Sequence, residues 1–144
     1  MKSKQLSAQI EFSVEFYDVD SMGIVWHGNY IKYFEKVRCA LLEKIGYGYP
    51  QMTESGYAFP ITDIKVKYVK PLFFQQRVRA IATLEEYESI LRISYILQDA
   101  QTGAVTTKGK SSQVAIKIDT RTTCFDCPDI FITKVRSLLK QEGK

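Results

Sequence analysis

A stretch near the N-terminus, DVDSMGIVWHGNY at residues 18–30, gathers residue types that could carry out acid–base or nucleophilic chemistry. It holds the chain's only histidine (His27), its only tryptophan and its only asparagine, preceded by Asp18 and Asp20. A carboxylate can act as a nucleophile or as a general base. The Asp18–Val19–Asp20 pattern also fits a divalent-metal pair. A turn in which aspartate bonds the local backbone is the alternative that the spacing alone favours.

The residues after this stretch predict a long amphipathic helix over 30–45, with apolar side chains at spacings of three and four. The N-terminus of a buried helix offers unpaired backbone N–H groups and a positive dipole end of about half a charge. Such an end can polarise a carbonyl, which Asp20 could then attack directly or through a water that it deprotonates. A thioester suits this chemistry because thiolate is a good leaving group.

Other polar residues near this position have structural interpretations. His27, beside a tryptophan and a helix start, is equally typical of a capping or buried hydrogen-bonded histidine. Glu35 and Glu43 on the predicted helix are typical solvent-facing or interface carboxylates. Glu35 lies one or two turns from the helix start and is therefore kept as a reserve candidate for a chemical role.

The elements on either side of the helix can be predicted from periodicity. Alternating apolar residues predict a strand over 10–16, and Gly46 predicts the helix end. The segment GYGYPQMTESGYAFP at residues 46–60 predicts a turn with one short helical turn after Pro50 and no strand. These elements would hold the polar stretch between a strand and a buried helix.

The second half of the chain has the two-residue period of β structure. Strands are predicted over 64–68, 78–84 and 91–97, with a long last strand through Ile118, and the short connections favour an antiparallel meander. Pro128 and the apolar spacing after it predict a short C-terminal helix. The predicted fold class is α+β, with a long helix on one face of an antiparallel sheet in a single domain over 1–144.

Composition restricts the classes of function. The chain has 144 residues, a formal net charge of +4 and a pI near 8.9, which favours an anionic partner without identifying it. The three cysteines, Cys39, Cys124 and Cys127, are an odd number and argue against a disulfide framework, and there is no apolar run of membrane-spanning or signal length. We therefore expect a soluble, cytoplasmic protein with no membrane span.

Several enzyme motifs are missing from the sequence. The chain has no G-x-x-x-x-G-K-[ST], G-x-G-x-x-G or G-x-S-x-G pattern, and one histidine excludes H-E-x-x-H zinc sites. Cys124 and Cys127 have C-x-x-C spacing but lack a second ligand pair, so a structural or incidental role is expected. No metal site is predicted.

The segment FYDVDSMGIVWHGNYIKYFEKVR, residues 16–38, resembles the signature of the 4-hydroxybenzoyl-CoA thioesterase family of hotdog-fold proteins. In this family an aromatic residue and D-x-D are followed by a small loop, G-x-V, an aromatic-His or aromatic-Tyr pair, x-N-Y and an aromatic-rich helix. The segments KYVKPLFFQQRVRAIA and GKSSQVAIKID resemble later strands of the family, so the likeness covers nearly the whole chain. The resemblance implies a long helix wrapped by a curled five-stranded antiparallel sheet.

The resemblance also implies roles for individual residues. The catalytic carboxylate of the family falls on Asp20, whereas Asp18 becomes a loop-shaping residue. His27 matches the position whose backbone N–H polarises the thioester carbonyl, with Gly28 at the helix terminus completing the oxyanion hole. Whether the aspartate acts as nucleophile or as general base stays open. Another branch of hotdog thioesterases carries its carboxylate on the long helix, which is the basis for keeping Glu35.

Substrate, cofactor and assembly follow from the same resemblance. The expected reaction is hydrolysis of an acyl-CoA to free acid and CoA, with CoA as part of the substrate and no separate cofactor. The expected assembly is a homo-oligomer, either a dimer or a homotetramer formed as a dimer of dimers, with the substrate at the subunit boundary. Basic residues along the later strands and turns are candidate phosphate partners, although most are expected to form only a solvated sheet face: Lys65, Lys67, Lys70, Arg77, Arg79, Arg92, Lys108 and Lys110.

Two other functions compete with hydrolysis. The same fold could serve as a non-hydrolytic binding module for acyl-CoA or acyl carrier protein, which the presence of Asp20 and His27 disfavours. Nucleic-acid binding has weak support because the basic residues alternate along strands and are not clustered with stacking aromatic residues. No nucleic-acid partner is therefore expected, and acyl-chain preference is left open.

Overall fold

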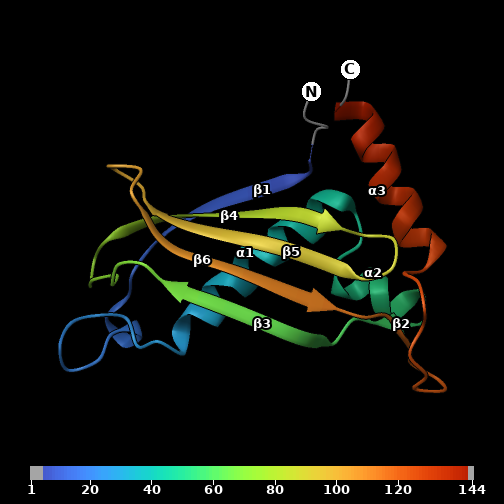
Figure 1. Cartoon of the computed structure of the whole chain (residues 1–144), viewed down its shortest axis with the longest axis horizontal. Helices are drawn as coiled ribbons and strands as arrows, with labels where there is room; N and C mark the ends of the chain where they lie inside the picture. Colours follow the sequence, from blue (N-terminus) through green and yellow to red (C-terminus); the bar gives the residue numbers. More distant parts are fainter. Residues whose placement is uncertain (1–4, 143–144) are drawn as a thin grey trace.

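The computed structural model describes residues 5–142, which form a curved antiparallel sheet around one long helix (Figure 1). The elements in chain order are β1 (Ser7–Ser13), the 3-10 turn η1 (Phe16–Asp18), α1 (Asn29–Ile45), α2 (Tyr49–Glu54), β2 (Tyr57–Ala58), β3 (Ile61–Tyr68), β4 (Arg77–Glu86), β5 (Leu91–Asp99), β6 (Val105–Gln113), β7 (Ile116–Lys117) and α3 (Asp129–Glu142). The predicted α+β class with a five-stranded antiparallel sheet is confirmed.

The first strand begins and ends earlier than the sequence predicts. The expectation was a strand over 10–16, but β1 ends at Ser13 and Phe16 lies in η1. The backbone N–H of Glu15 donates to the Asp18 carboxylate (3.0 Å), and this cap ends the extended run. The chain therefore turns toward the polar stretch sooner than the alternation indicates.

The sheet order is β1-β4-β5-β6-β3, so the four-strand meander predicted for the second half is only partly correct. Strands β4, β5 and β6 do form consecutive antiparallel pairs. Strand β3 pairs with β6 instead of β4, because residues 69–76 form a long connection that carries the chain across to β4, beside β1. Strand β3 is consequently an edge of the sheet.

The predicted last strand is interrupted before Ile118. Strand β6 ends at Gln113, and Ile116 and Lys117 form β7, which pairs with β2 inside the segment where no strand was predicted. Pro60 precedes β3 and has no backbone N–H, so the β3–β6 ladder cannot continue past it. Ile116 and Lys117 instead pair with Ala58 and Tyr57 of β2.

Helix α1 confirms the predicted long helix and begins one residue earlier, at Asn29. Gly46 ends it in the left-handed conformation (φ 87°), with its N–H donating to the carbonyls of Leu42 and Glu43, as predicted for this glycine. One stripe of the helix is buried, and its members include an arginine: Asn29, Tyr30, Tyr33, Phe34, Val37, Arg38, Leu41, Leu42 and Ile45. The opposite side of α1 is not covered by the rest of the described chain and faces solvent.

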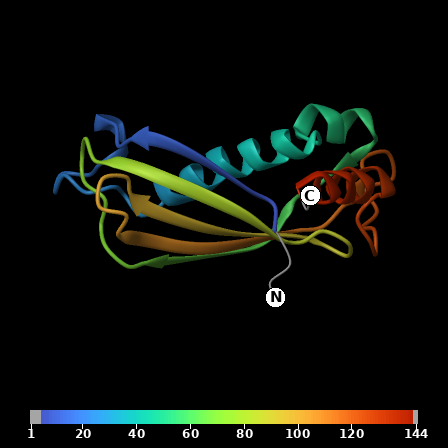
Figure 2. The same cartoon turned by 90° about the horizontal axis from the view of Figure 1, so that it is seen from above.

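The buried stripe of α1 lies along the concave side of the sheet (Figure 2). Phe34 stacks on Tyr95 of β5, with ring centroids 4.5 Å apart and planes within 7°. Gly109 of β6 lies so close that a Cβ at this position would come within 2.4 Å of the Phe34 ring. A glycine in the strand therefore sets how closely helix and sheet approach.

Helix α3 confirms the predicted C-terminal helix and follows Pro128. Its Phe131 packs against Tyr47 and Phe59 at the far end of the molecule from the loop 18–28 (Figure 1). Burial raises the pKa of the Cys127 thiol to about 12, and Cys39, Cys124 and Cys127 are all unpaired. Among residues 5–142, no helix has the length and apolarity needed to cross a membrane.

Candidate active site

Asp18 is the hydrogen-bonding centre of the segment that joins β1 to α1. Its Oδ2 accepts from the Tyr33 hydroxyl (2.9 Å) and from the Glu15 N–H (3.0 Å). Its backbone carbonyl accepts from the Trp26 N–H (3.0 Å) and from the Asn29 side-chain amide (2.8 Å). Asp18 thus joins both ends of the loop to the first turns of α1, which agrees with a loop-shaping role.

Burial of Tyr33, together with its bond to the Asp18 carboxylate, raises the pKa of the Tyr33 phenol well above its usual value. The phenol therefore remains a proton donor to Asp18 over the whole physiological range. Tyr33 also contacts Phe12 of β1, with ring centroids 4.6 Å apart. The tyrosine fixes Asp18 between the first strand and the helix.

Asp20 sits at the turn of a small hairpin that projects from this anchored base. Val19 bridges Val25, and the Asp20 N–H donates to the Ile24 carbonyl (2.9 Å). The Asp20 Oδ1 accepts from the Met22 N–H (2.8 Å), which is the aspartate turn that the spacing indicates. Asp20 is exposed, and within residues 5–142 its Oδ2 has no hydrogen-bond partner. One carboxylate oxygen is held and the other is free.

The connection between β3 and β4 fixes the hairpin from the opposite side. The Val25 N–H donates to the Leu72 carbonyl (2.9 Å), and Ile24 bridges Phe73. The Leu72 N–H in turn donates to the buried Tyr30 hydroxyl (3.3 Å). The long crossing that displaces β3 to the sheet edge is therefore also what supports the Asp20 loop.

His27 and Gly28 form the start of α1. The His27 carbonyl accepts from the Tyr68 hydroxyl at the end of β3 (2.9 Å), and the His27 ring is exposed beside Trp26, with centroids 5.0 Å apart. The Trp26 indole lies directly over Gly28, since a Cβ there would come within 2.1 Å of the ring. No side chain larger than hydrogen fits at Gly28 with the indole in place.

The helix start carries free hydrogen-bond donors. In the described part of the chain, the backbone N–H groups of His27 and Gly28 have no acceptor. The positive end of the α1 dipole is at the same place. A carbonyl or carboxylate oxygen of a bound molecule could accept from these groups, which is the geometry of an oxyanion hole.

The structure thus places Asp20, His27 and Gly28 in one exposed loop at the N-terminus of α1. Glu35 lies on the uncovered side of the helix, with 59% of its side chain exposed, and pairs with Arg38 (3.2 Å). Glu43 is also exposed on α1. No group of three histidine, cysteine, aspartate or glutamate side chains able to hold a metal ion occurs within residues 5–142.

Three residues that support the loop carry no predicted role. Asn29, Tyr33 and Tyr68 each donate to an oxygen of the loop or its base. Tyr33 lies four residues after Asn29 on α1, a spacing that would have placed both on the side facing the loop. No sequence signal links Tyr68 to His27, because their contact depends on the position of β3 at the sheet edge.

A long helix in a curled antiparallel sheet, with a polar loop at the helix start, defines the hotdog fold class. The sequence profile described as "Thioesterase-like superfamily" matches residues 14–137. The chain belongs to the thioesterase-like superfamily.

Known proteins similar to this chain fit that family. YneP of Bacillus subtilis (strain 168), named as a candidate acyl-CoA thioesterase, is 29% identical over 106 residues, 74% of this chain and 77% of YneP. The solved DHNA-CoA thioesterase of Staphylococcus aureus is 29% identical, with a TM-score of 0.79 over 96% of this chain and 95% of that one. Another S. aureus protein, solved in complex with CoA, superposes with a TM-score of 0.82 over 97% of this chain and 87% of its own, but at 16% identity it shows the fold alone.

Proposed function

We propose that this protein hydrolyses an acyl-CoA thioester to the free acid and CoA, as a member of the 4-hydroxybenzoyl-CoA thioesterase family. The observation that carries the proposal is the arrangement at the start of α1. An exposed carboxylate oxygen of Asp20 shares a loop with the free backbone N–H groups of His27 and Gly28. The names of two similar proteins support the same reaction: YneP is named as a candidate acyl-CoA thioesterase, and the S. aureus protein is named as a DHNA-CoA thioesterase.

The proposed reaction divides its work between the two ends of the loop. The thioester carbonyl oxygen accepts hydrogen bonds from the N–H groups of His27 and Gly28, which stabilise the negative charge that develops on it. Asp20 either attacks the carbonyl carbon or removes a proton from a water that attacks it. The C–S bond then breaks and the CoA thiolate leaves. Water supplies the oxygen and protons that complete the acid and the thiol.

The two roles of Asp20 predict different species during turnover. If Asp20 is the nucleophile, a mixed anhydride forms between its carboxyl group and the acyl group before water attacks. Intact-mass measurement after rapid acid quench would then find the protein heavier by one acyl group. A general base leaves the mass of the protein unchanged throughout turnover.

The assembly and surroundings of the enzyme are part of the proposal. We propose a homo-oligomer, either a dimer or a homotetramer built as a dimer of dimers. Its support is that β3 is an edge strand, that Ile61 and Tyr68 are exposed on it, and that Ile31 is exposed on α1. We further propose that the enzyme needs neither metal nor cofactor and binds no nucleic acid. The unpaired cysteines fit a cytoplasmic location.

A thiol-release assay tests the proposal. The panel contains short aliphatic, medium aliphatic and aromatic acyl-CoA esters, together with the same acyl groups on acyl carrier protein. Release of thiol by the wild type, lost in Asp20→Asn and kept in Asp126→Asn, is the expected result. Asp126 is an exposed aspartate in the segment before α3 and serves as the matched control.

The alternative binding module gives a different result in the same experiment. A protein that only binds acyl-CoA would show a thermal shift with the esters and no thiol release from any of them. Asp20→Asn with wild-type turnover on the best substrate would instead remove Asp20 from the mechanism while leaving the reaction itself in place.

A further inference from the structure

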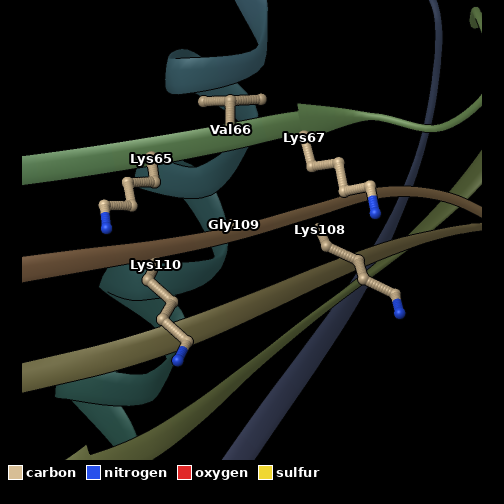
Figure 3. A pocket seen from close by; sticks show the side chains of 6 residues that line it. All are labelled: Lys65, Val66, Lys67, Lys108, Gly109 and Lys110. Atoms are coloured by element: carbon tan, nitrogen blue, oxygen red, sulfur yellow. The ribbon is translucent and has the colours of Figure 1, made fainter.

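Four lysines form a compact cluster on the outer face of the sheet, the side away from α1 (Figure 3). Lys65 is directly opposite Lys110, and Lys67 is directly opposite Lys108, in the antiparallel pairing of β3 and β6. All four side chains are exposed. Neighbouring strands lie about 5 Å apart and alternate residues about 7 Å apart, so the four side chains start from a small rectangle. This four-lysine cluster is separate from the Asp20 loop.

The other cations on the outer face have acidic partners. Arg79 pairs with Glu11 (3.0 Å), Arg77 pairs with the same carboxylate (3.6 Å), and Arg92 pairs with Glu86 (3.1 Å). Within residues 5–142, none of the four lysines of the cluster forms an ion pair. The arginines of β4 and β5 thus each have an acidic partner, whereas in the described part of the chain the four lysines of β3 and β6 have none.

The arrangement is unfavourable for the protein alone. Like charges directly opposite on neighbouring strands repel each other and destabilise the pair, and here two such pairs lie side by side. A bound anion with several negative charges would attract all four lysines and offset their mutual repulsion. Lysine ammonium groups are strong donors to phosphate oxygens.

The surface between the four lysines is open to a small molecule. A hollow of about 580 Å³ is lined by the four lysines together with Val66 and Gly109. Val66 packs toward the core, and the missing Cβ of Gly109 would point at Phe34, so neither residue fills the outer side. The lysines therefore surround exposed backbone that a compact ligand can approach.

We propose that the four-lysine cluster is a binding site for a polyphosphate anion, a group with two or more linked phosphates. Four positive charges around one hollow match a small, dense anion better than carboxylates spread over a protein surface. The phosphates have two sources, the nucleotide end of a CoA ester or a free nucleotide. For the first source only, the inference rests on the proposed function.

Inorganic tripolyphosphate is the probe that tests the site without any thioester. The variant is Lys65→Gln/Lys110→Gln, and the control is Lys117→Gln/Lys140→Gln, which removes the same charge from exposed positions elsewhere. Calorimetric titration should show binding to the wild type and the control, and at least about tenfold weaker binding to the variant. Equal affinity for all three proteins, or no binding to any, overturns the proposal.

A melting experiment provides a second readout of the same variants. Without ligand, Lys65→Gln/Lys110→Gln should melt at a temperature equal to or above that of the wild type, because one repelling pair is gone. With tripolyphosphate, the wild type should gain more in melting temperature than the variant. A variant that melts lower and still responds fully to the anion contradicts the proposal.

Competition identifies the source of the phosphates. If the source is the substrate, CoA displaces tripolyphosphate, and its binding weakens in the variant whereas that of pantetheine, which has no phosphates, does not. If the source is a free nucleotide, ATP displaces tripolyphosphate and CoA does not. Binding of poly-glutamate without any binding of tripolyphosphate assigns the cluster to an acidic protein and overturns the proposal. None of these measurements requires hydrolysis, so they remain informative if Asp20→Asn is fully active.

Discussion

Asp18 and Asp20 are two residues apart, yet they belong to two very different regions of the same loop. The base of the loop, centred on Asp18, receives four hydrogen bonds, two at its Oδ2 and two at its backbone carbonyl, which join it to α1, to Glu15 and to the far end of the loop. At the tip, the exposed Asp20 carboxylate accepts one hydrogen bond, from an N–H of its own turn. The fold therefore holds the Asp18 carboxylate through a contact with α1, whereas the Asp20 carboxylate is held only within its own turn and faces solvent.

This separation has a physical basis. A carboxylate oxygen that accepts two hydrogen bonds from the fold, as the Asp18 Oδ2 does, is stabilised in place and has little left to offer a substrate. A reactive carboxylate needs a free oxygen and a rigid support, and here the support is the anchored base and the connection 69–76. Stability and activity should therefore respond to different aspartates.

Asp20→Asn should give the largest effect. Loss of the carboxylate should lower turnover by about 10²–10⁴-fold, the usual contribution of a positioned acid–base group. The free energy of unfolding should change by less than about 0.5 kcal/mol, because Asn keeps the turn oxygen at an exposed site. Steady-state thiol release and urea unfolding measure the two quantities. A large loss of stability would break the proposed separation.

Gly28→Ala, at the start of α1, should have the second-largest effect on turnover. The new methyl group would collide with the Trp26 indole, which lies within 2.1 Å of the Cβ position. Displacing the indole and the neighbouring N–H groups should cost about 10²-fold in turnover, since small misplacements in a site have effects of this size. Because Trp26 is the only tryptophan, its fluorescence reports the displacement directly. Unchanged emission and turnover would show that the indole does not constrain the site.

Asp18→Ala should have its main effect on stability, unlike substitution of Asp20. The Tyr33 hydroxyl and the Glu15 N–H would lose their acceptor, which should lower the free energy of unfolding by about 1–3 kcal/mol. Asp20→Ala is the matched control and should lose less than about 0.5 kcal/mol. Chemical denaturation of the two variants side by side gives the comparison. Equal losses would mean that base and tip do not differ in their structural contribution.

Tyr33→Phe should have the smallest effect, about 1 kcal/mol in the free energy of unfolding. It also has a pH signature. The pKa of Tyr33 is raised in the folded protein, so above pH 10 the folded state binds more protons than the unfolded state. This contribution to stability is complete below about pH 10 and is lost as the pH rises further. Unfolding at pH 8 to 11 should show a shallower decline for Tyr33→Phe than for the wild type.

Local patterns in the sequence predict the helices and strands well, but they predict less well which strands lie side by side in the sheet. The spacing of apolar residues and Gly46 locate α1 to within one residue, and Pro128 marks the start of α3. Alternation shows which residues of a strand share a face, but it does not show which strand lies beside it. The position of β3 next to β6 depends on the path of residues 69–76, which contact the Asp20 loop, a segment distant in sequence.

The same limit applies to the candidate site. Asp20, His27 and Gly28 are neighbours in sequence, so their grouping in one loop could be predicted. The contacts of Tyr68 with His27 and of Leu72 with Tyr30 join segments about forty residues apart. Only the tertiary structure brings these segments together.

The close approach of Phe34 to Gly109 has a consequence for the evolution of the family. The two residues occupy one shared volume, in which the ring on α1 takes the space that a side chain on β6 would need. A relative that places alanine or serine at position 109 should have a smaller residue at position 34, whereas a relative with a large ring at 34 should retain glycine. The two positions should therefore covary across an alignment, despite being 75 residues apart.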